Sequence, residues 1–336
     1  MAAGCGNSDN QSIFDTKGPV ASTELYTTMI TLWVSVGIFV VVGSALVFAL
    51  VRFRAPADLG PETPLPSQSH GNAALEAVLT LVSICLLVII AWPTIPAIFK
   101  LDAMPTAEEK PVIIEAKGWQ WWWEFTYLNT KKKVYVGNEM HIPVGRKILL
   151  RLESSDVIHS FWVPKLGGKT DVIPNQHNQM WLLADQKGVY YGQCAEYCGT
   201  SHANMRFKVV AGDADDFEKW IMHQDSAAVD PPAGSLAARG KEIFIKGPKE
   251  GQACSSCHMI KGTPAAGIVG PNLTHVGSRL NLASGILDNN DHDLKMWLHD
   301  PGAVKPGNHM ATMAMPPLHL SDDEVNALAA YLEMLK

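Results

Sequence analysis

The chain has 336 residues, of which 27 are Lys or Arg and 33 are Asp or Glu, so its formal net charge is −6. This length is enough for two or more globular domains. The sequence contains no basic run, and its mildly acidic balance argues against a nucleic-acid partner. Hydrophobic residues make up 47% of the chain but are unevenly spread, which indicates segments of different character.

The chain opens with MAAGCGNS, within a tail that we assign to residues 1–22. Ala-Gly-Cys before a polar stretch resembles the end of a bacterial lipoprotein signal, in which Cys5 would carry the lipid. The apolar segment that normally precedes such a cysteine is missing, so an ordinary tail cysteine is the alternative.

Two uncharged, strongly apolar runs follow, at residues 25–51 and 77–99. Each exceeds the roughly 20 residues that an α-helix needs to cross a bilayer. A buried core helix is the alternative for either run alone. Arg52 and Arg54 lie in the loop between the runs, and the positive-inside rule places such a loop on the cytoplasmic side. Residues 23–105 are therefore predicted to form a two-helix transmembrane hairpin, with the rest of the chain outside.

Short β-type runs, separated by turn signals such as PVG and DQKG, occupy residues 111–212. Regular short strands of this kind predict an all-β sandwich. A short amphipathic helix at residues 213–223 closes the domain, which we bound at residues 106–225. The small, Pro-containing stretch that follows, residues 226–235, is predicted to be a linker.

A dense group of metal-ligand side chains lies in YYGQCAEYCGTSHANM, residues 190–205. Two thiolates, an imidazole and a thioether are the ligand types of copper electron-transfer sites on β-sandwiches. One blue copper needs a single Cys, whereas two thiolates can bridge two copper ions, each with its own His. The pattern therefore predicts a dinuclear copper site, with a structural zinc ion and a disulfide as the alternatives. The predicted copper ligands are His159, Cys194, the main-chain carbonyl of Glu196, Cys198, His202 and Met205.

Residues 236–336 show the apolar spacing of helices. Near their start, Cys254, Cys257 and His258 have the C-x-x-C-H spacing at which two thiols bind haem c covalently and the His binds its iron. The module resembles a class I cytochrome c, an all-helical fold in which a proline carbonyl, here that of Pro271 in GIVGPNL, orients the iron-binding His.

Three methionines compete for the second axial position on the haem iron, in KPGNHMATMAMPPLHLSDDE. A methionine partner to His raises the potential of the haem. We prefer Met310, because Pro306 and Gly307 fix the turn that presents its sulfur. Met315 is the alternative, because it has the short spacing to the last helix that many bacterial cytochromes show. Met313 matches neither pattern and is expected to be a packing residue.

The aromatic run KGWQWWWEFTY, the segment DVIHSFWVPKLGGKTDVIP and the thiol group closely resemble subunit II of haem–copper cytochrome c oxidase, over about residues 23–223. The resemblance implies a cupredoxin-like Greek-key sandwich that binds the dinuclear centre CuA through the six ligands named above. It also implies that the Glu196 side chain faces a magnesium ion at the border with subunit I. Trp121 matches the tryptophan through which electrons enter in this family, and a core aromatic is the alternative.

HGNAALEAVLT, at the start of the second apolar run, matches the family's His-Gly-Asn-x-x-x-Glu pattern. Glu76 then lies where the family has a carboxylate at the cytoplasmic mouth of a proton channel, and an ionisable group at a membrane boundary is by default a candidate for a functional role. A simple interfacial carboxylate is the alternative. The Trp and Pro that usually follow are replaced by Leu79 and Ser83-Ile84, which leaves the local helix geometry open.

These resemblances imply the copper subunit of a terminal oxidase with a fused cytochrome c domain, held in a bacterial inner membrane. Electrons would pass from a periplasmic donor, either a cytochrome c or a quinol-oxidising complex, through haem c and CuA to subunit I, for oxygen reduction and proton pumping. Subunits I and III and the lipid bilayer are the expected partners. Two other functions stay open: a membrane-tethered electron-transfer module, and the copper subunit of a nitric oxide reductase.

Overall fold

The computed structural model describes residues 10–55, 60, 71–313 and 319–336. Cys5 and Met315, both singled out in the sequence, lie outside the described residues. The chain divides into two compact units, one formed by residues 23–103 and the other by residues 1–22 together with 104–336.

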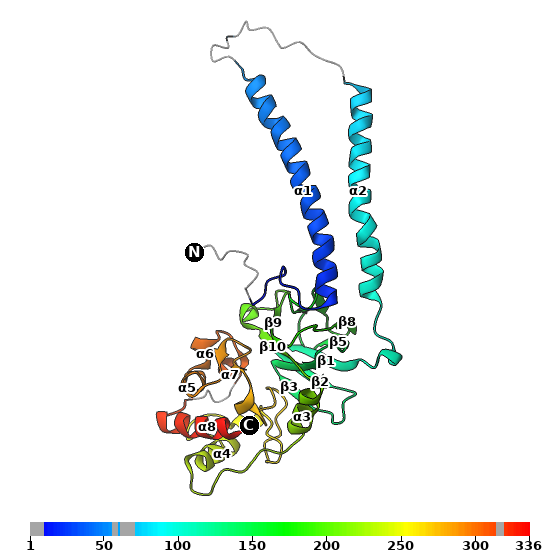
Figure 1. The fold of residues 1–336 in the computed structure, drawn as a ribbon. Helices are drawn as coiled ribbons and strands as arrows, with labels where there is room; N and C mark the ends of the chain where they lie inside the picture. The colour runs from blue at the N-terminus through cyan, green and yellow to red at the C-terminus, as the bar shows by residue number, and fades with distance from the viewer. Residues whose placement is uncertain (1–9, 56–59, 61–70, 314–318) are drawn as a thin grey trace. The chain divides into compact units, whose positions relative to one another are not determined.

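Two long helices, α1 (Pro19–Arg52) and α2 (Ala73–Asp102), contain the two predicted apolar runs (Figure 1). Both are long and apolar enough to cross a membrane, and none of the residues of α2 is buried within the chain. A helix that is apolar on all sides and uncovered by protein is suited to lipid. The side chain of Asn72 caps α2 by accepting hydrogen bonds from the backbone N–H groups of Ala74 and Leu75.

Two five-stranded sheets form the sandwich in the described part of the chain, with the strand orders β3-β2-β1-β5-β8 and β4-β10-β9-β6-β7. In β1 buried and half-buried residues alternate, as expected for a strand with one face on a core. The strands are β1 (Val112–Trp119), β2 (Trp122–Tyr127), β3 (Tyr135–Gly137), β4 (Glu139–Pro143), β5 (Ile148–Ser154), β6 (His159–Trp162), β7 (Thr170–Val172), β8 (Asn178–Leu182), β9 (Gly188–Cys194) and β10 (Arg206–Gly212).

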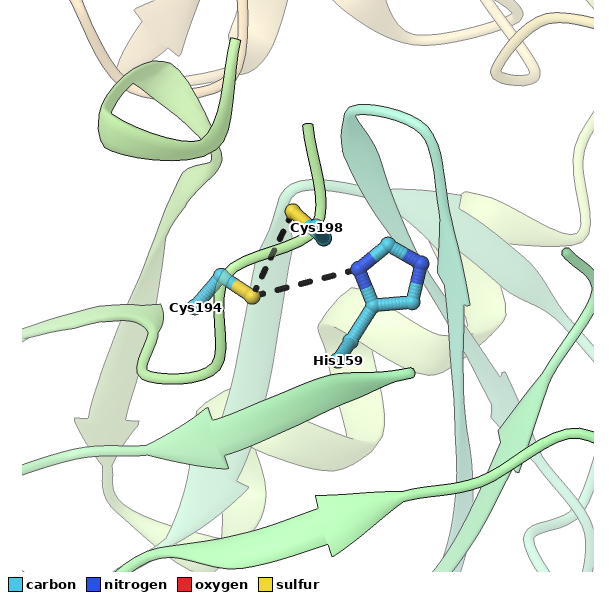
Figure 2. Close-up of side chains that lie close together, drawn as sticks. All are labelled: His159, Cys194 and Cys198. Atoms are coloured by element: carbon cyan, nitrogen blue, oxygen red, sulfur yellow. Dashed lines mark hydrogen bonds between the residues drawn. The ribbon is translucent and has the colours of Figure 1, made fainter. Parts of the chain in front are cut away.

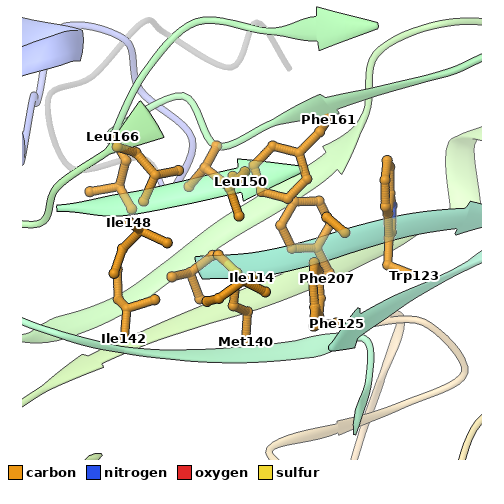
Figure 3. Packing of buried hydrophobic residues seen from close by; sticks show 14 of the residues in the cluster. Ile114, Trp123, Phe125, Met140, Ile142, Ile148, Leu150, Phe161, Leu166 and Phe207 are labelled. Carbon is orange, nitrogen blue, oxygen red and sulfur yellow. The ribbon is translucent and has the colours of Figure 1, made fainter. Parts of the chain in front are cut away.

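Large aromatic side chains fill the space between the two sheets (Figure 3). The ring centroids of Phe161 and Phe207 lie 4.8 Å apart, and those of Trp123 and Phe207 lie 5.5 Å apart. Gly192 is required beside them, because a Cβ at this position would lie 2.2 Å from the Phe207 ring. This packing fixes β6 and β9, which carry His159 and Cys194, and β10, which follows the loop that holds the other predicted copper ligands.

Helix α3 (Ala214–Gln224) closes the sandwich, and short helices are then the main regular elements of the C-terminal domain. A short hairpin of β11 and β12 is added to the predicted helical pattern. The boundaries that we assigned to the domains from the sequence stay predictions. The remaining elements are α4 (Leu236–Lys246), α5 (Asp291–His299), α6 (Pro301–Val304), α7 (His309–Thr312), α8 (Asp322–Met334), the 3-10 turns η1 (Ala107–Glu109), η2 (His202–Asn204), η3 (Cys254–Ser256) and η4 (Val276–Ser278), and the strands β11 (Asn281–Leu282) and β12 (Leu287–Asp288).

Helices α4 and α8 cross closely in this domain (Figure 1). The crossing depends on Gly240, because a Cβ there would lie 1.9 Å from the carbonyl oxygen of Ala327. Next to it, the rings of Phe244 and Tyr331 pack edge to face, with centroids 6.0 Å apart. The two helices thereby form one wall of a cavity that also contains the C-x-x-C-H segment.

Candidate copper and haem sites

The two thiols of the predicted copper site converge at the end of β9 (Figure 2). Cys194 is the last residue of that strand and pairs with Phe161 of β6, which places His159 beside it. The Sγ atoms of Cys194 and Cys198 lie 3.8 Å apart, and Cys194 Sγ lies 3.8 Å from His159 Nδ1. All three side chains are buried, so water competes weakly for a metal held between them.

The remaining predicted ligands lie around the same two sulfurs. The carbonyl oxygen of Glu196 is 3.2 Å from Cys194 Sγ. On the other side of the pair, Cys198 Sγ lies 3.5 Å from His202 Nδ1 and 3.8 Å from Met205 Sδ. The backbone N–H of Cys194 donates to the carbonyl of Met205 at 2.9 Å, which ties the two ends of the ligand loop together.

This arrangement distinguishes among the three sites left open by the sequence. The Sγ–Sγ distance of 3.8 Å is far longer than the roughly 2.05 Å of a disulfide. Each sulfur has its own imidazole, and the thioether and carbonyl are weak ligands beyond the four that a structural zinc takes. Two thiols this close together, each beside its own imidazole, suit a pair of copper ions better than a zinc ion or a disulfide.

The protonation of the two thiols is coupled through their contact. The hydrogen bond with Cys198 lowers the pKa of Cys194, and the His159 ring lowers it further, although burial opposes both effects. The same contact and burial raise the pKa of Cys198. Cys194 is therefore the thiol that ionises more easily, and a metal bound through both sulfurs would release the proton of Cys198.

Asp156 is a residue of this site that the sequence pattern did not reveal. Its Oδ1 lies 2.7 Å from His159 Nε2, and its Oδ2 accepts a hydrogen bond from the backbone N–H of Gln120 at 2.6 Å. A carboxylate on the outer nitrogen of a ligating His fixes the tautomer and the ring orientation. Asp156 therefore directs His159 Nδ1 toward the thiols.

The predicted haem site is a cavity in the C-terminal domain. Cys254, Cys257, His258 and Met310 line it, together with apolar side chains that include Leu298 and Leu328. His258 Nδ1 lies 2.9 Å from the carbonyl oxygen of Pro271, and burial lowers the pKa of the ring. The imidazole is thus held neutral with Nε2 free to bind iron. An apolar cavity with two thiols and this His at its edge fits a covalently bound haem.

Met310 and Met313 both line this cavity. Met310 also packs against the helical core, whereas Met313 is 56% exposed. Met310 is held on a firm turn, because the Asn308 side chain donates to the carbonyls of Pro301 and Lys305 at 2.6 Å and accepts from Ala311 N–H. These contacts favour Met310 over Met313 as the axial ligand.

Comparison with known proteins matches both of the domains that carry these sites to known families. Residues 129–212 match the family described as "Cytochrome C oxidase subunit II, periplasmic domain", and residues 237–336 match "Cytochrome c". Cytochrome c oxidase subunit 2 of Alkalihalophilus pseudofirmus is 39% identical over 337 residues, which cover 99% of this chain and 93% of the relative. The chain belongs to the cytochrome c oxidase subunit 2 family. The resemblance drawn from the sequence is thus confirmed, as is the order of helical pair, β-sandwich and cytochrome c domain.

A second relative is similar over the whole length of this chain. Cytochrome c oxidase subunit 2 of Bacillus subtilis is 33% identical over 351 residues, which cover 100% of this chain and 94% of the relative. Among solved structures, the periplasmic domain of subunit II of the Bradyrhizobium japonicum cytochrome oxidase is 32% identical, covers 34% of this chain and 92% of that chain, and has a TM-score of 0.33.

Two further residues that the subunit 2 family suggests are Glu196 and Glu76. The Glu196 side chain is exposed, which leaves it accessible to a magnesium ion or a partner subunit. Glu76 lies in the first turn of α2 and is also exposed. No described contact fixes the role of either carboxylate, so both assignments stay predictions.

Trp121 lies between the copper ligands and the haem cavity. It is 9% exposed, and its Nε1–H donates to the carbonyl of Cys198 at 3.0 Å. On its other side the ring centroid is 5.4 Å from that of His309, the residue next to Met310, and Trp121 itself lines the haem cavity. Of the four tryptophans in WQWWW, Trp121 is therefore the one that contacts both sites.

Proposed function

We propose that this chain receives electrons for a respiratory terminal oxidase and passes them, one at a time, from a periplasmic donor through haem c and dinuclear CuA to subunit I. The observation that carries the proposal is the position of Trp121, which contacts both a copper-ligand residue and the haem cavity. Haem c and CuA, when bound, each supply reversible one-electron chemistry. The side chains of this chain hold them, exclude water and fix the path between them.

The two thiolates of Cys194 and Cys198 would hold the copper pair, together with the other four predicted ligands around them. Because the two Sγ atoms lie 3.8 Å apart, both thiolates could bind the same two copper ions, which would then share one electron. The Met205 thioether and the Glu196 carbonyl would be weak ligands, which adjust the redox potential of the copper pair but contribute little to its binding. Asp156 keeps the His159 ring oriented through each change of charge.

The residues that would hold the haem are Cys254 and Cys257, through covalent attachment, and His258 and Met310, through its iron. The Pro271 carbonyl fixes the His258 ring by accepting its Nδ1–H. The apolar lining excludes water from the haem, which favours the less charged, ferrous state.

The path from haem c to copper runs through Trp121. From its indole Nε1–H a single hydrogen bond reaches the carbonyl of Cys198, the residue whose thiolate would bind copper. The aromatic ring fills the space that would otherwise hold water between the two sites. Transfer along this path needs no proton and no bond cleavage.

A time-resolved experiment tests the proposal. Purified oxidase is mixed with reduced cytochrome c in a stopped-flow instrument, and the haem c and CuA absorption bands are followed separately. Haem c should be reduced first and CuA second, with oxygen consumed in steady turnover. Reduction of CuA while haem c stays oxidised would contradict the proposed order, and a complex that reduces nitric oxide but not oxygen would contradict the oxidase assignment.

The two apolar helices, the tail and two exposed carboxylates would link this chain to the membrane and to the other subunits. We place α1 and α2 in the bacterial inner membrane against subunits I and III, with the copper and haem domains on the periplasmic side and Cys5 as the lipid-bearing residue. The Glu196 side chain would bind a magnesium ion at the subunit I border. Glu76 would deliver cytoplasmic protons for reduction of oxygen and for pumping.

Glu76→Gln should slow oxygen consumption by the purified oxidase at least about tenfold, because a neutral amide cannot pass on a proton. Reduction of haem c and CuA by the external donor should keep the wild-type rates, since neither step needs a proton. Asp102→Asn is the matched control, because Asp102 is an exposed carboxylate at the other end of α2. Unchanged turnover in Glu76→Gln would make Glu76 a simple interfacial carboxylate.

A further inference from the structure

Lys305 is a buried lysine at the contact between the cytochrome c domain and the sandwich. It lies between α6 and α7 and is 3% exposed. Its Nζ donates to the carbonyl oxygen of Trp121 at 2.6 Å and to Ser284 Oγ at 2.8 Å. Ser284 Oγ donates to the same Trp121 carbonyl at 3.0 Å. Two side chains of the cytochrome c domain thus converge on one backbone oxygen of the sandwich.

The segments that carry Lys305 and Ser284 contact the copper-ligand loop as well. The backbone N–H of Arg206 donates to the carbonyl of Ser284 at 3.1 Å, and Ser201 Oγ donates to the carbonyl of Pro306. Gly307, at φ +80°, passes so close to Thr200 that a Cβ would lie 2.9 Å from its side chain. The contact therefore spans the loop between Cys198 and β10, next to the copper ligands.

A buried lysine is costly, because its ammonium group loses water. The hydrogen bonds of Nζ go to a carbonyl and a hydroxyl, neither of which carries a charge, and burial lowers the pKa of Lys305 to about 7. Protonated or neutral, the amine keeps N–H groups to donate. Lysine side chains normally stay at the protein surface, where water solvates the ammonium group. The buried position of Lys305 therefore indicates a role at the Trp121 carbonyl.

We propose that Lys305, together with Ser284, is a positioning residue that holds the cytochrome c domain on Trp121 and so sets the rate at which an electron crosses from haem c to CuA. In that step the ferrous haem iron is oxidised to ferric and the copper pair takes up the electron, with no bond broken and no proton moved. The inference rests on the proposed function. Because the contact leaves Trp121 only 9% exposed, it also directs an external donor to haem c instead of to this ring.

The test uses three variants of the complete oxidase. Lys305→Met removes the donor while keeping an unbranched apolar stem, and Ser284→Ala removes one hydroxyl. Lys246→Met is the matched control, because Lys246 belongs to the same domain and its side chain is 72% exposed. A ruthenium complex in solution is excited by a laser pulse to reduce haem c, and the CuA band is then followed.

Transfer from haem c to CuA should slow about tenfold or more in Lys305→Met and by a smaller factor in Ser284→Ala, because the rate depends on the two redox partners being held in position. The control should match the wild type. Reduction of haem c by the external cytochrome c, and the haem spectrum, should stay unchanged in all three variants. A merely structural role in the cytochrome c fold would change those two measurements as well.

Hydroxyl-radical labelling of Trp121 in the full-length chain gives a readout that needs no electron transfer. Labelling should rise in Lys305→Met and in Ser284→Ala but not in Lys246→Met. If the Lys305→Met variant fails to incorporate haem, the transfer rate and the Trp121 labelling of Ser284→Ala test the proposal. Wild-type transfer rates together with wild-type labelling would overturn the role of Lys305. A wild-type oxidase in which haem c never reduces CuA would instead contradict the proposed function, while the labelling would still report on the contact.

Discussion

Cys194→Ser should lower the copper content of the purified full-length chain from about two ions to one or fewer, because a serine oxygen is a poor substitute for a bridging thiolate. Cys194 is the sulfur that contacts His159, the Glu196 carbonyl and Cys198, so its loss removes a ligand from both ions. Metal analysis gives the count, and the electron paramagnetic resonance signal of an electron shared by two coppers should vanish with it.

Two controls separate loss of the bridge from general damage. Cys85→Ser changes an exposed cysteine in α2 and should leave both copper ions in place. Met205→Leu should retain copper with a shifted potential, because an axial thioether is a weak ligand. One copper ion with an intense blue colour in the unaltered chain would contradict the dinuclear site, and two copper ions in Cys194→Ser would contradict the bridge.

The copper ligands could be predicted because most of them lie within one short loop. Cys194 to Met205 spans the end of β9 and the turn before β10, so the sequence spacing nearly determines which side chains meet. The remaining predicted ligand, His159, comes from β6, and the pairing of β6 with β9 brings it next to Cys194. The segment DVIHSFWVP suggested His159 as a ligand, but the residues near it in the sequence do not predict that it would lie next to Cys194.

Several features could not be predicted because they depend on contacts between distant segments. The turn at Gln120 and Trp121 lies in an aromatic run without a turn signal, and Asp156 stabilises it from 36 residues away. Likewise, the parallel pairing of β1 with β5 has no signature within either strand.

The contact made by Lys305 is the clearest example of a feature that the sequence could not predict. Lys305 lies 184 residues from Trp121 in the sequence and Ser284 lies 163 residues from it. A lysine in a polar, Pro-containing segment is expected at the surface. Only the folded chain shows that the Lys305 ammonium group donates to the backbone carbonyl of Trp121, between the two predicted redox sites.

Met310→Leu should remove the weak long-wavelength absorption band of the sulfur–iron bond and lower the potential of haem c, within the range of about 0.8 V over which axial ligands tune haem potentials. Leucine keeps the apolar volume but offers no lone pair to iron, so the position opposite His258 loses its ligand. The covalent attachment at Cys254 and Cys257 does not involve Met310, so the haem content should be unchanged. Optical spectra and a redox titration of the purified chain measure all three properties.

The two other methionines provide the matched controls. Met313→Leu should keep the band, because this partly exposed side chain lies on the cavity wall without the firm turn that holds Met310. Met315→Leu should also keep it if Met310 binds the iron. The turn supports this expectation: Gly307 has the positive φ of +80° that lets the chain reverse after Pro306, and Asn308 then caps the short helix that carries Met310. A band that survives Met310→Leu and disappears in Met315→Leu would show that the loop after α7 supplies the sulfur, and that the turn at Gly307 serves the contact with the sandwich alone.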